Sequence, residues 1–222
     1  MKSNQITKII FSMACFLFFS CFLTFPAVAE DQFKYYIGGG WGPTTIDGDV
    51  TNRSSVYYHN EDYGYKYFAG AMFNEFVGVE LGYADFGEVE LAGDNGSSFV
   101  SNGLTNTFSR SDSRLSVEPT SWYLGMLLAL PMGKITNSNG MKWFNPFIKA
   151  GVHYYDVEFL IKTGSMSTQS GNYDGFNCFV GGGIDFNLLE NFAIRTEFEY
   201  FPMDDGVAED VSFYSGSLIY RF

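Results

Sequence analysis

Charged side chains recur at every second position in parts of this sequence, and that spacing limits the chemistry they could support. In residues 193–200, which read AIRTEFEY, Arg195, Glu197 and Glu199 share one parity and uncharged residues hold the other. Successive side chains of a β-strand point to opposite faces, so these charges would lie together. The same alternation along the chain predicts one charged face that carries both signs and suits ion pairing: Lys66, Glu80, Lys149, Arg195, Glu197, Glu199 and Arg221.

Two histidines, His59 and His153, are the candidate general bases of the chain. His59 lies close in sequence to Ser55 and Glu61, so a Ser-His-Glu group for acyl hydrolysis or transfer is an open alternative. His153 shares the parity of Lys149 and has no serine two residues further on. Because polar residues are abundant here, such a grouping is expected by chance, and we expect no catalytic residues and a hydrogen-bonded structural role for His153.

Metal and cofactor signals are weak in this sequence. Calcium takes six to eight oxygen ligands, and no segment matches a full cation-binding loop. The acidic clusters that could contribute oxygens are Asp47-Gly-Asp49, Asp204-Asp205 and Glu209-Asp210. The glycine runs 38–40 and 181–183 lie inside alternating segments, where small residues let a sheet curve tightly. We therefore expect no metal site and no cofactor, and the 25 acidic against 13 basic residues disfavour nucleic acid as a partner.

Eight segments of alternating pattern must position these side chains. They cover residues 33–42, 63–74, 76–87, 116–130, 142–158, 175–188, 191–201 and 211–222. Each is long enough to supply the roughly 9–11 residues with which a tilted strand crosses a bilayer. The links alternate in length: residues 43–62, 88–115 and 159–174 are long, 131–141 and 202–210 are moderate, and 74–75 and 189–190 are tight.

Both ends of the chain indicate its compartment. Lys2 and Lys8 precede an apolar run over residues 9–25, and residues 27–29 read AVA, which predicts a signal peptide over residues 1–29 that is cleaved before Glu30. A retained anchor and a lipidated Cys21 are weaker alternatives. Residues 30–222 then form one domain. Its last segment alternates and ends on Tyr220 and Phe222, the aromatic ending that outer-membrane barrels present as an assembly signal.

These observations predict an all-β fold, an eight-stranded antiparallel up-and-down transmembrane β-barrel in the bacterial outer membrane. Its termini and short turns would be periplasmic and its long loops extracellular. Charges facing lipid are costly, so the charged face must point inward. Eight strands enclose only enough space for side chains to fill, so we expect an ion-paired plug. Outward aromatic residues would mark the membrane boundaries: Trp41, Tyr83, Trp122, Tyr154, Tyr200, Tyr220 and Phe222.

Residues 64–87, which read GYKYFAGAMFNEFVGVELGYADFG, resemble the second and third strands of the outer-membrane protein A transmembrane domain and its small-barrel relatives. Residues 193–200 and 220–222 are similar to the seventh and eighth strands of that family. The resemblance implies inward charges at Glu80, Lys149 and Glu197. Leu127 stands where the best-known member has an inward lysine, so an ion-pair gate does not carry over. We expect no peptidoglycan-binding domain after Phe222.

The leading functional hypothesis is a non-enzymatic barrel that contributes to envelope integrity and displays its loops at the surface, with adhesion to host or surface ligands. A narrow gated channel and an enzyme that modifies lipid A are the alternatives. The expected partners are outer-membrane lipids and lipopolysaccharide, the barrel-assembly machinery and periplasmic chaperones. Divalent ions bridging the acidic clusters to lipopolysaccharide phosphates are a further open possibility.

Overall fold

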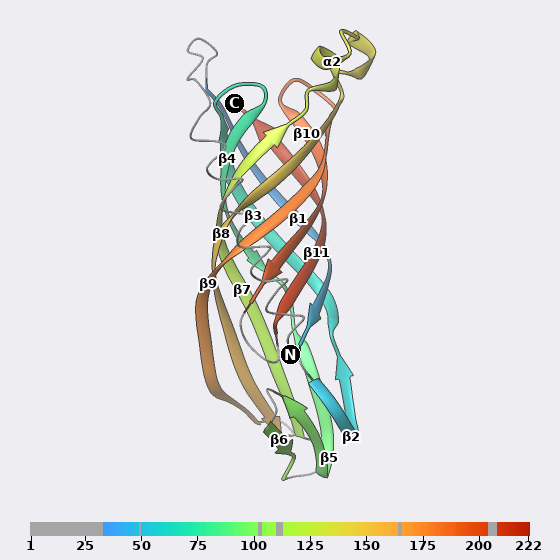
Figure 1. Cartoon of the computed structure of the whole chain (residues 1–222), viewed down its shortest axis with the longest axis vertical. Coiled ribbons are helices and arrows are strands. Elements are labelled where there is room, and N and C mark those ends of the chain that lie inside the picture. Colours follow the sequence, from blue (N-terminus) through green and yellow to red (C-terminus); the bar gives the residue numbers. More distant parts are fainter. Residues whose placement is uncertain (1–32, 49, 102–103, 110–112, 164–165, 204–207) are drawn as a thin grey trace.

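Eight strands close into an antiparallel barrel in a computed structural model that describes residues 33–48, 50–101, 104–109, 113–163, 166–203 and 208–222 (Figure 1). The predicted signal peptide lies outside these residues. Each barrel strand pairs with the next, and pairing of the first strand with the last closes the sheet. This confirms the predicted closed, eight-stranded antiparallel barrel. The strands are β1 (Lys34–Asp47), β3 (Glu61–Met72), β4 (Val77–Asp85), β7 (Ser113–Ala129), β8 (Phe144–Thr163), β9 (Met166–Asn187), β10 (Phe192–Pro202) and β11 (Asp210–Arg221).

The alternating sequence pattern becomes an alternation of burial. In β11, Leu218 is 57% exposed on the outside of the barrel, while its neighbour Ile219 is fully buried inside. Four residues earlier, the exposed Tyr214 and the buried Ser215 repeat that contrast. Because the period of a strand is two, one apolar exterior and one filled interior follow directly from the sequence.

The end of the barrel that carries Lys34 and Arg221 is called the terminal end here. Its β3–β4 turn is fixed by the Asn74 side chain, whose Oδ1 accepts hydrogen bonds from the backbone N–H groups of Phe76 and Val77, both at 2.8 Å. The link between β7 and β8 forms α2 (Met132–Ile135) and a 3₁₀ turn, η1 (Asn139–Met141). No helix in the described part of the chain is long and apolar enough to cross a membrane.

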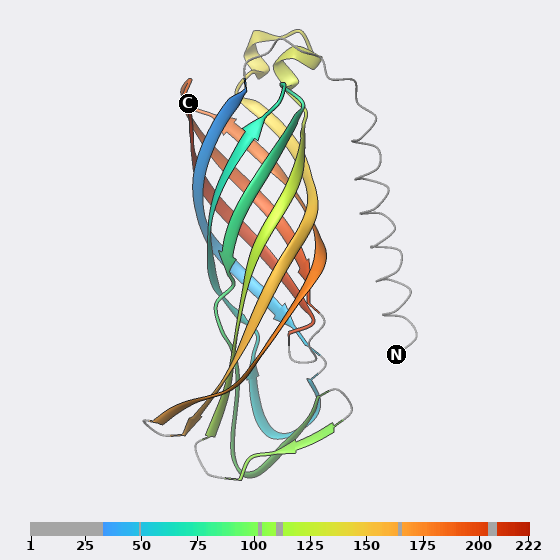
Figure 2. The same ribbon diagram turned by 90° about the vertical axis from the view of Figure 1, so that its left-hand side faces the viewer.

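The opposite end, called the distal end, differs from the sequence prediction, which treated residues 43–62, 88–115 and 159–174 as loops. These segments are largely strands: β2 (Val50–His59), β5 (Val89–Ser101), β6 (Leu104–Thr107) and the outer parts of β7, β8 and β9. β5 pairs with β2, β6 and β7, and the β8–β9 hairpin continues to the pair Thr163 and Met166. The sheet therefore extends well beyond the barrel, as Figure 2 shows.

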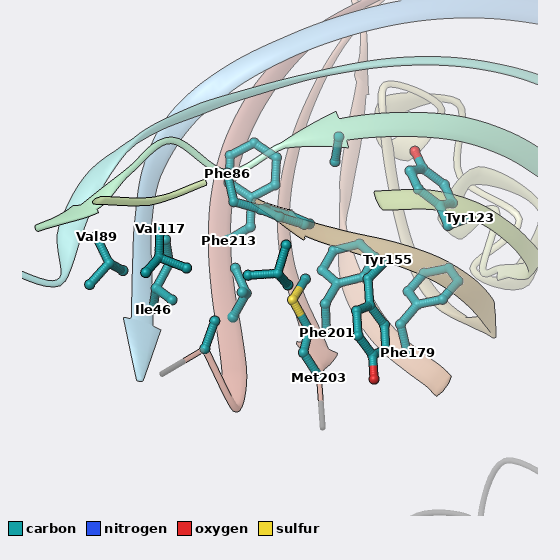
Figure 3. Close-up of a cluster of buried hydrophobic side chains, with 14 of the residues drawn as sticks. Ile46, Phe86, Val89, Val117, Tyr123, Tyr155, Phe179, Phe201, Met203 and Phe213 are labelled. Atoms are coloured by element: carbon teal, nitrogen blue, oxygen red, sulfur yellow. The ribbon is translucent and has the colours of Figure 1, made fainter. Parts of the chain in front are cut away.

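Apolar side chains fill the distal part of the interior (Figure 3). The rings of Phe179 and Phe201 stack with their centroids 5.0 Å apart and their planes 10° from parallel. Phe86 contacts Phe201 and Phe213. Burial of such side chains stabilises each by roughly 1.5–3 kcal/mol relative to exposure, so this cluster is a true core inside the barrel. Its other labelled members are Ile46, Val89, Val117, Tyr123, Tyr155 and Met203.

Candidate functional site in the charged interior

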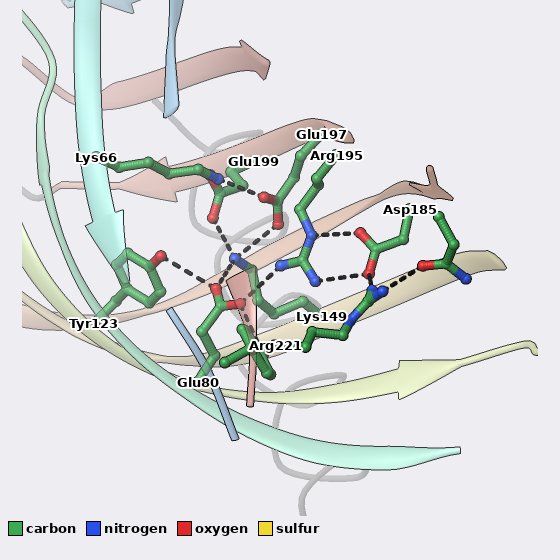
Figure 4. Close-up of polar contacts among 11 residues, drawn as sticks. Lys66, Glu80, Tyr123, Lys149, Asp185, Arg195, Glu197, Glu199 and Arg221 are labelled. Carbon is green, nitrogen blue, oxygen red and sulfur yellow. Dashed lines mark hydrogen bonds and ion pairs between the residues drawn. The ribbon is translucent and has the colours of Figure 1, made fainter. Parts of the chain in front are cut away.

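The structure brings the charged side chains of the sequence together inside the barrel (Figure 4). The charged residues of β10 lie nearer the terminal end than Phe201 of the apolar cluster, and along β11 Arg221 lies nearer that end than Phe213. Five strands contribute these side chains, which explains why no single segment of sequence shows the complete set. The residues come from β3, β4, β8, β10 and β11, in that order: Lys66, Glu80, Lys149, then Arg195, Glu197 and Glu199, then Arg221. All except Arg221 are buried.

Glu80 lies at the centre of this network and accepts four hydrogen bonds. One carboxylate oxygen accepts hydrogen bonds from Lys149 Nζ at 2.8 Å and from the Tyr123 hydroxyl at 3.2 Å. The other oxygen accepts hydrogen bonds from Arg195 Nη1 at 2.7 Å and from the Tyr36 hydroxyl at 3.0 Å. A buried carboxylate is tolerated only when it is paired and hydrogen-bonded, and Glu80 meets both conditions.

The two lysines hold the two glutamates of β10. Lys149 Nζ lies 2.7 Å from an oxygen of Glu197 and 2.6 Å from an oxygen of Glu199. Lys66 Nζ forms ion pairs with the other oxygen of each of these two carboxylates. Lys149 Nζ also lies 4.8 Å from the centre of the Tyr123 ring, at the distance of a cation–π contact. Two cations therefore bridge carboxylates that would otherwise repel each other.

Asp185 is the member of the network that sequence reasoning missed. Arg195 binds it through Nε at 2.7 Å and Nη2 at 3.1 Å, the two-pronged geometry that favours arginine–carboxylate pairs. Arg221 Nη2 donates to the same carboxylate at 3.0 Å. With Asp185 included, four cations face four carboxylates, so the interior is formally neutral. The signal was present in the sequence, because Asp185 shares the inward parity of the buried Phe179.

Glycines make room for the large side chains of this interior. A Cβ atom added to Gly82 would overlap the ring of Tyr123, and one added to Gly70 would overlap the ring of Tyr36. Both tyrosines donate to Glu80. The glycines thus leave the space in which the hydroxyl donors of the network lie.

A cavity of about 540 Å³ opens at the terminal end and reaches the network. Asp185, Arg195 and Arg221 line its inner wall, and Lys34 and Phe222 lie among the residues around it. The ion pairs of Asp185 form the boundary between this cavity and the buried part of the interior.

The histidines do not form a catalytic triad in the described residues. His153 is buried, its Nδ1 lies 3.0 Å from the Ser121 hydroxyl, and its Nε2 lies 3.0 Å from the carbonyl oxygen of Pro202. A backbone carbonyl thus occupies the position of the third group, where a triad has a carboxylate. Sequence reasoning missed Ser121 because it lies on the neighbouring strand. At the distal end, His59 stacks on Tyr57 and makes no hydrogen bond to Ser55 or Glu61 within the described part of the chain.

Two of the acidic clusters meet across strands, since Asp47 and Asp210 are direct partners in the β1–β11 register. Asp49, Asp204 and Asp205 lie outside the described residues. Within the described residues, no group of three or more metal-binding side chains is arranged to hold an ion.

Aromatic residues cover parts of the barrel exterior. Tyr83, Trp122, Tyr154 and Phe176 are consecutive partners across four strands and form one continuous outward row. At the terminal end, Tyr220 and Phe222 are exposed and in contact with each other, with ring centroids 5.1 Å apart. The backbone N–H of Phe222 donates to the carbonyl of Tyr35 at 3.0 Å, so the last residue is held against β1.

A closed eight-stranded sheet with an apolar, aromatic exterior and an ion-paired interior defines a small transmembrane β-barrel. The family model described as "Outer membrane protein beta-barrel domain" matches residues 13–222. The chain therefore belongs to the outer membrane protein β-barrel family, and it is an integral outer-membrane protein of bacterial type. This confirms the expected likeness to small outer-membrane barrels.

Among solved structures, those of Ail support the fold. Ail, the attachment invasion locus protein of Yersinia pestis, in complex with the heparin analogue sucrose octasulfate, is 14% identical over 86% of this chain and 100% of its own, with a TM-score of 0.51. A second Ail structure is 16% identical over the same shares, with a TM-score of 0.50. The N-terminal barrel of Pseudomonas aeruginosa OprF is 10% identical over 86% of this chain and 97% of its own, with a TM-score of 0.45. No curated protein matches the sequence.

Proposed function

We propose that this protein is a non-enzymatic outer-membrane barrel with a closed interior, which contributes to envelope integrity and displays its distal sheet outside the cell. In this proposal residues 1–29 are removed as a signal peptide and the terminal end faces the periplasm. One observation carries the closed interior: four cations, three of them buried, and four carboxylates pair across the barrel between six strands. The apolar cluster lies over them on the distal side.

Surface display is supported by the distal sheet. An ordered platform of paired strands holds its outer residues in fixed positions, which suits recognition of a partner. Acidic residues are frequent on the outward face at this end, and like charges stand directly opposite each other in the pairs Asp156–Asp174 and Glu118–Glu158. Ail was solved with a polyanion, but this acidic surface would repel one. We therefore propose that adhesion, if it is the role of this sheet, involves ligands other than sulfated polyanions.

Lipid and assembly partners follow from the exterior. The outward apolar belt would contact outer-membrane lipids and lipopolysaccharide. Tyr220 and Phe222 would present the end of β11 to the barrel-assembly machinery after periplasmic chaperones deliver the chain. Both side chains are exposed, as a recognition signal requires.

Planar-bilayer conductance of the refolded mature protein tests the closed interior. Heat-modifiable gel mobility first establishes that the barrel is folded. A closed interior predicts flat traces from folded wild-type protein. Well-resolved conductance steps that shift in Glu80→Gln but not in Glu90→Gln, a charge loss on distal strand β5 away from the terminal cavity, would overturn it.

The second candidate, a narrow gated channel, is favoured by the terminal cavity. That cavity already brings solvent to Asp185 and Arg221, so opening would require only the ion pairs beyond them to separate. The channel proposal predicts single-channel steps whose frequency rises when Lys149 is changed to Met. Flat traces from folded Lys149→Met protein would count against it.

A further inference from the structure

The terminal link, residues 130–143, presents both apolar and basic side chains at the terminal end. Leu130, Ile135, Met141 and Trp143 are exposed large apolar residues, and Lys134 and Lys142 lie between them in sequence. Exposed apolar residues next to lysines are the usual composition of a segment that lies at a membrane interface. The lipid-facing exterior of β8, with exposed Ile148 and Val152, continues from this link.

Three basic residues outside the charged interior lie at this end. They are Lys34, Lys134 and Lys142, while Arg53, Arg114 and Lys162 lie on strands at the distal end. The acids of the terminal end outside the interior are Glu75 and Glu190. The distal exterior is rich in acids. The terminal link itself holds two lysines and no acid, although the net charge of the chain is −12.

The terminal link is held in a defined shape. The Thr136 hydroxyl donates to the carbonyl of Met132 at 2.6 Å, and Trp143 Nε1 donates to the carbonyl of Gly140 at 2.7 Å. A Cβ on Gly133 would lie 2.6 Å from Lys142 Cγ, so the two ends of the link pack closely. An ion pair from Lys134 to Glu75 ties the link to the β3–β4 turn.

We propose that the terminal link docks on the membrane leaflet at its own end, with Lys142 and Lys134 at anionic phospholipid headgroups and Ile135, Met141 and Trp143 in the interfacial layer. The identity of this leaflet rests on the proposed periplasmic orientation of the terminal end. The docking itself does not depend on that orientation. Two features favour a lipid surface as the occupant: positive charge that complements phosphate, and continuity with the lipid-facing wall of an integral barrel.

The test uses the full mature chain with Cys178→Ser and a spin label at Asn139→Cys, an exposed position within the link. The protein is placed in nanodiscs of phosphatidylcholine alone or of phosphatidylcholine with phosphatidylglycerol. Label accessibility to oxygen and to a water-soluble relaxation agent reports depth. Lys142→Glu is compared with Arg114→Glu, which makes the same charge change at the distal end. Heat-modifiable mobility of every variant keeps failure of the barrel separate from failure of docking.

Docking predicts a label that is shielded from the water-soluble agent in the anionic nanodiscs. Lys142→Glu should lower the docked fraction about fivefold or more, because one basic residue near an anionic surface contributes roughly that factor. Arg114→Glu should leave it unchanged. Equal accessibility in the two lipids, or no response to Lys142→Glu in folded protein, would overturn the proposal. A label shielded only when periplasmic extract is added would also overturn it and indicate a protein partner.

Discussion

Removal of the central carboxylate by Glu80→Gln should be one of the most destabilising single changes in this barrel. Glutamine keeps the size of the side chain but replaces one acceptor oxygen by an NH₂ group, which would then face a lysine or arginine donor. The interior would carry four cations against three carboxylates. Because removal of one partner from a buried ion pair costs about 3–5 kcal/mol, we expect the free energy of unfolding to fall by that amount.

The assay is urea unfolding of the mature protein refolded into phospholipid vesicles, followed by tryptophan fluorescence. Glu75→Gln is the matched control, because it removes the same charge from the partly exposed pair with Lys134. Exposed pairs contribute about 0–1 kcal/mol, so the control should lie close to wild type. The double variant Glu80→Gln with Lys149→Met restores equal numbers of cations and carboxylates. Its loss of stability should be smaller than the sum of the two single losses.

A loss below about 1 kcal/mol for Glu80→Gln, similar to the control, would refute this reasoning. It would mean that water enters the interior of the barrel and screens the charges of the ion-pair network. That result would also count against the closed interior in the proposed function, since screening of these groups requires an open path to solvent.

Three further changes test other parts of the structure. Gly82→Ala should lower the unfolding free energy by about 1–3 kcal/mol, because the added methyl group displaces Tyr123, and urea titration measures it. Phe222→Ser should reduce the amount of protein assembled in the outer membrane of cells while refolding into detergent stays efficient; equal assembly in cells would argue against the terminal signal. His153→Ala should cost about 1–3 kcal/mol by removing the buried hydrogen bonds of the ring to Ser121 and Pro202, and the mass of lipid A in cells that overproduce the protein should be the same for wild type and variant.

The alternation of side chains made much of the interior predictable from sequence. Lys66, Glu80 and Lys149 lie on three different segments of the sequence. Each has apolar neighbours on both sides, and because side chains alternate between the two faces of a strand, each points inward when its neighbours face out. Asp185 was missed because its segment, GGGID, has few side chains from which to read a parity. The pairing of Ser121 with His153 is a contact across strands, which the sequence of either strand alone does not reveal.

The distal sheet was not predictable by the same means. β2 and β5 contain Ser, Asn, Gly and Asp at positions where strands usually carry β-branched or aromatic residues. Their pairing with each other, and that of β5 with β7, supplies backbone hydrogen bonds that composition does not report. Turn-forming composition therefore indicated loops, and tertiary pairing overrode it.

The pairing of β1 with β11 has a consequence for biogenesis. Tyr36 is the register partner of Arg221, so the first strand has no neighbour on that side until the end of the chain has emerged. Such long-range pairing is slow, and until it forms both outer strands present unpaired N–H and C=O groups that invite aggregation. The nascent protein must therefore pass through a state with two open edges. Its yield in the cell is set by how well those edges are shielded, however stable the closed barrel is.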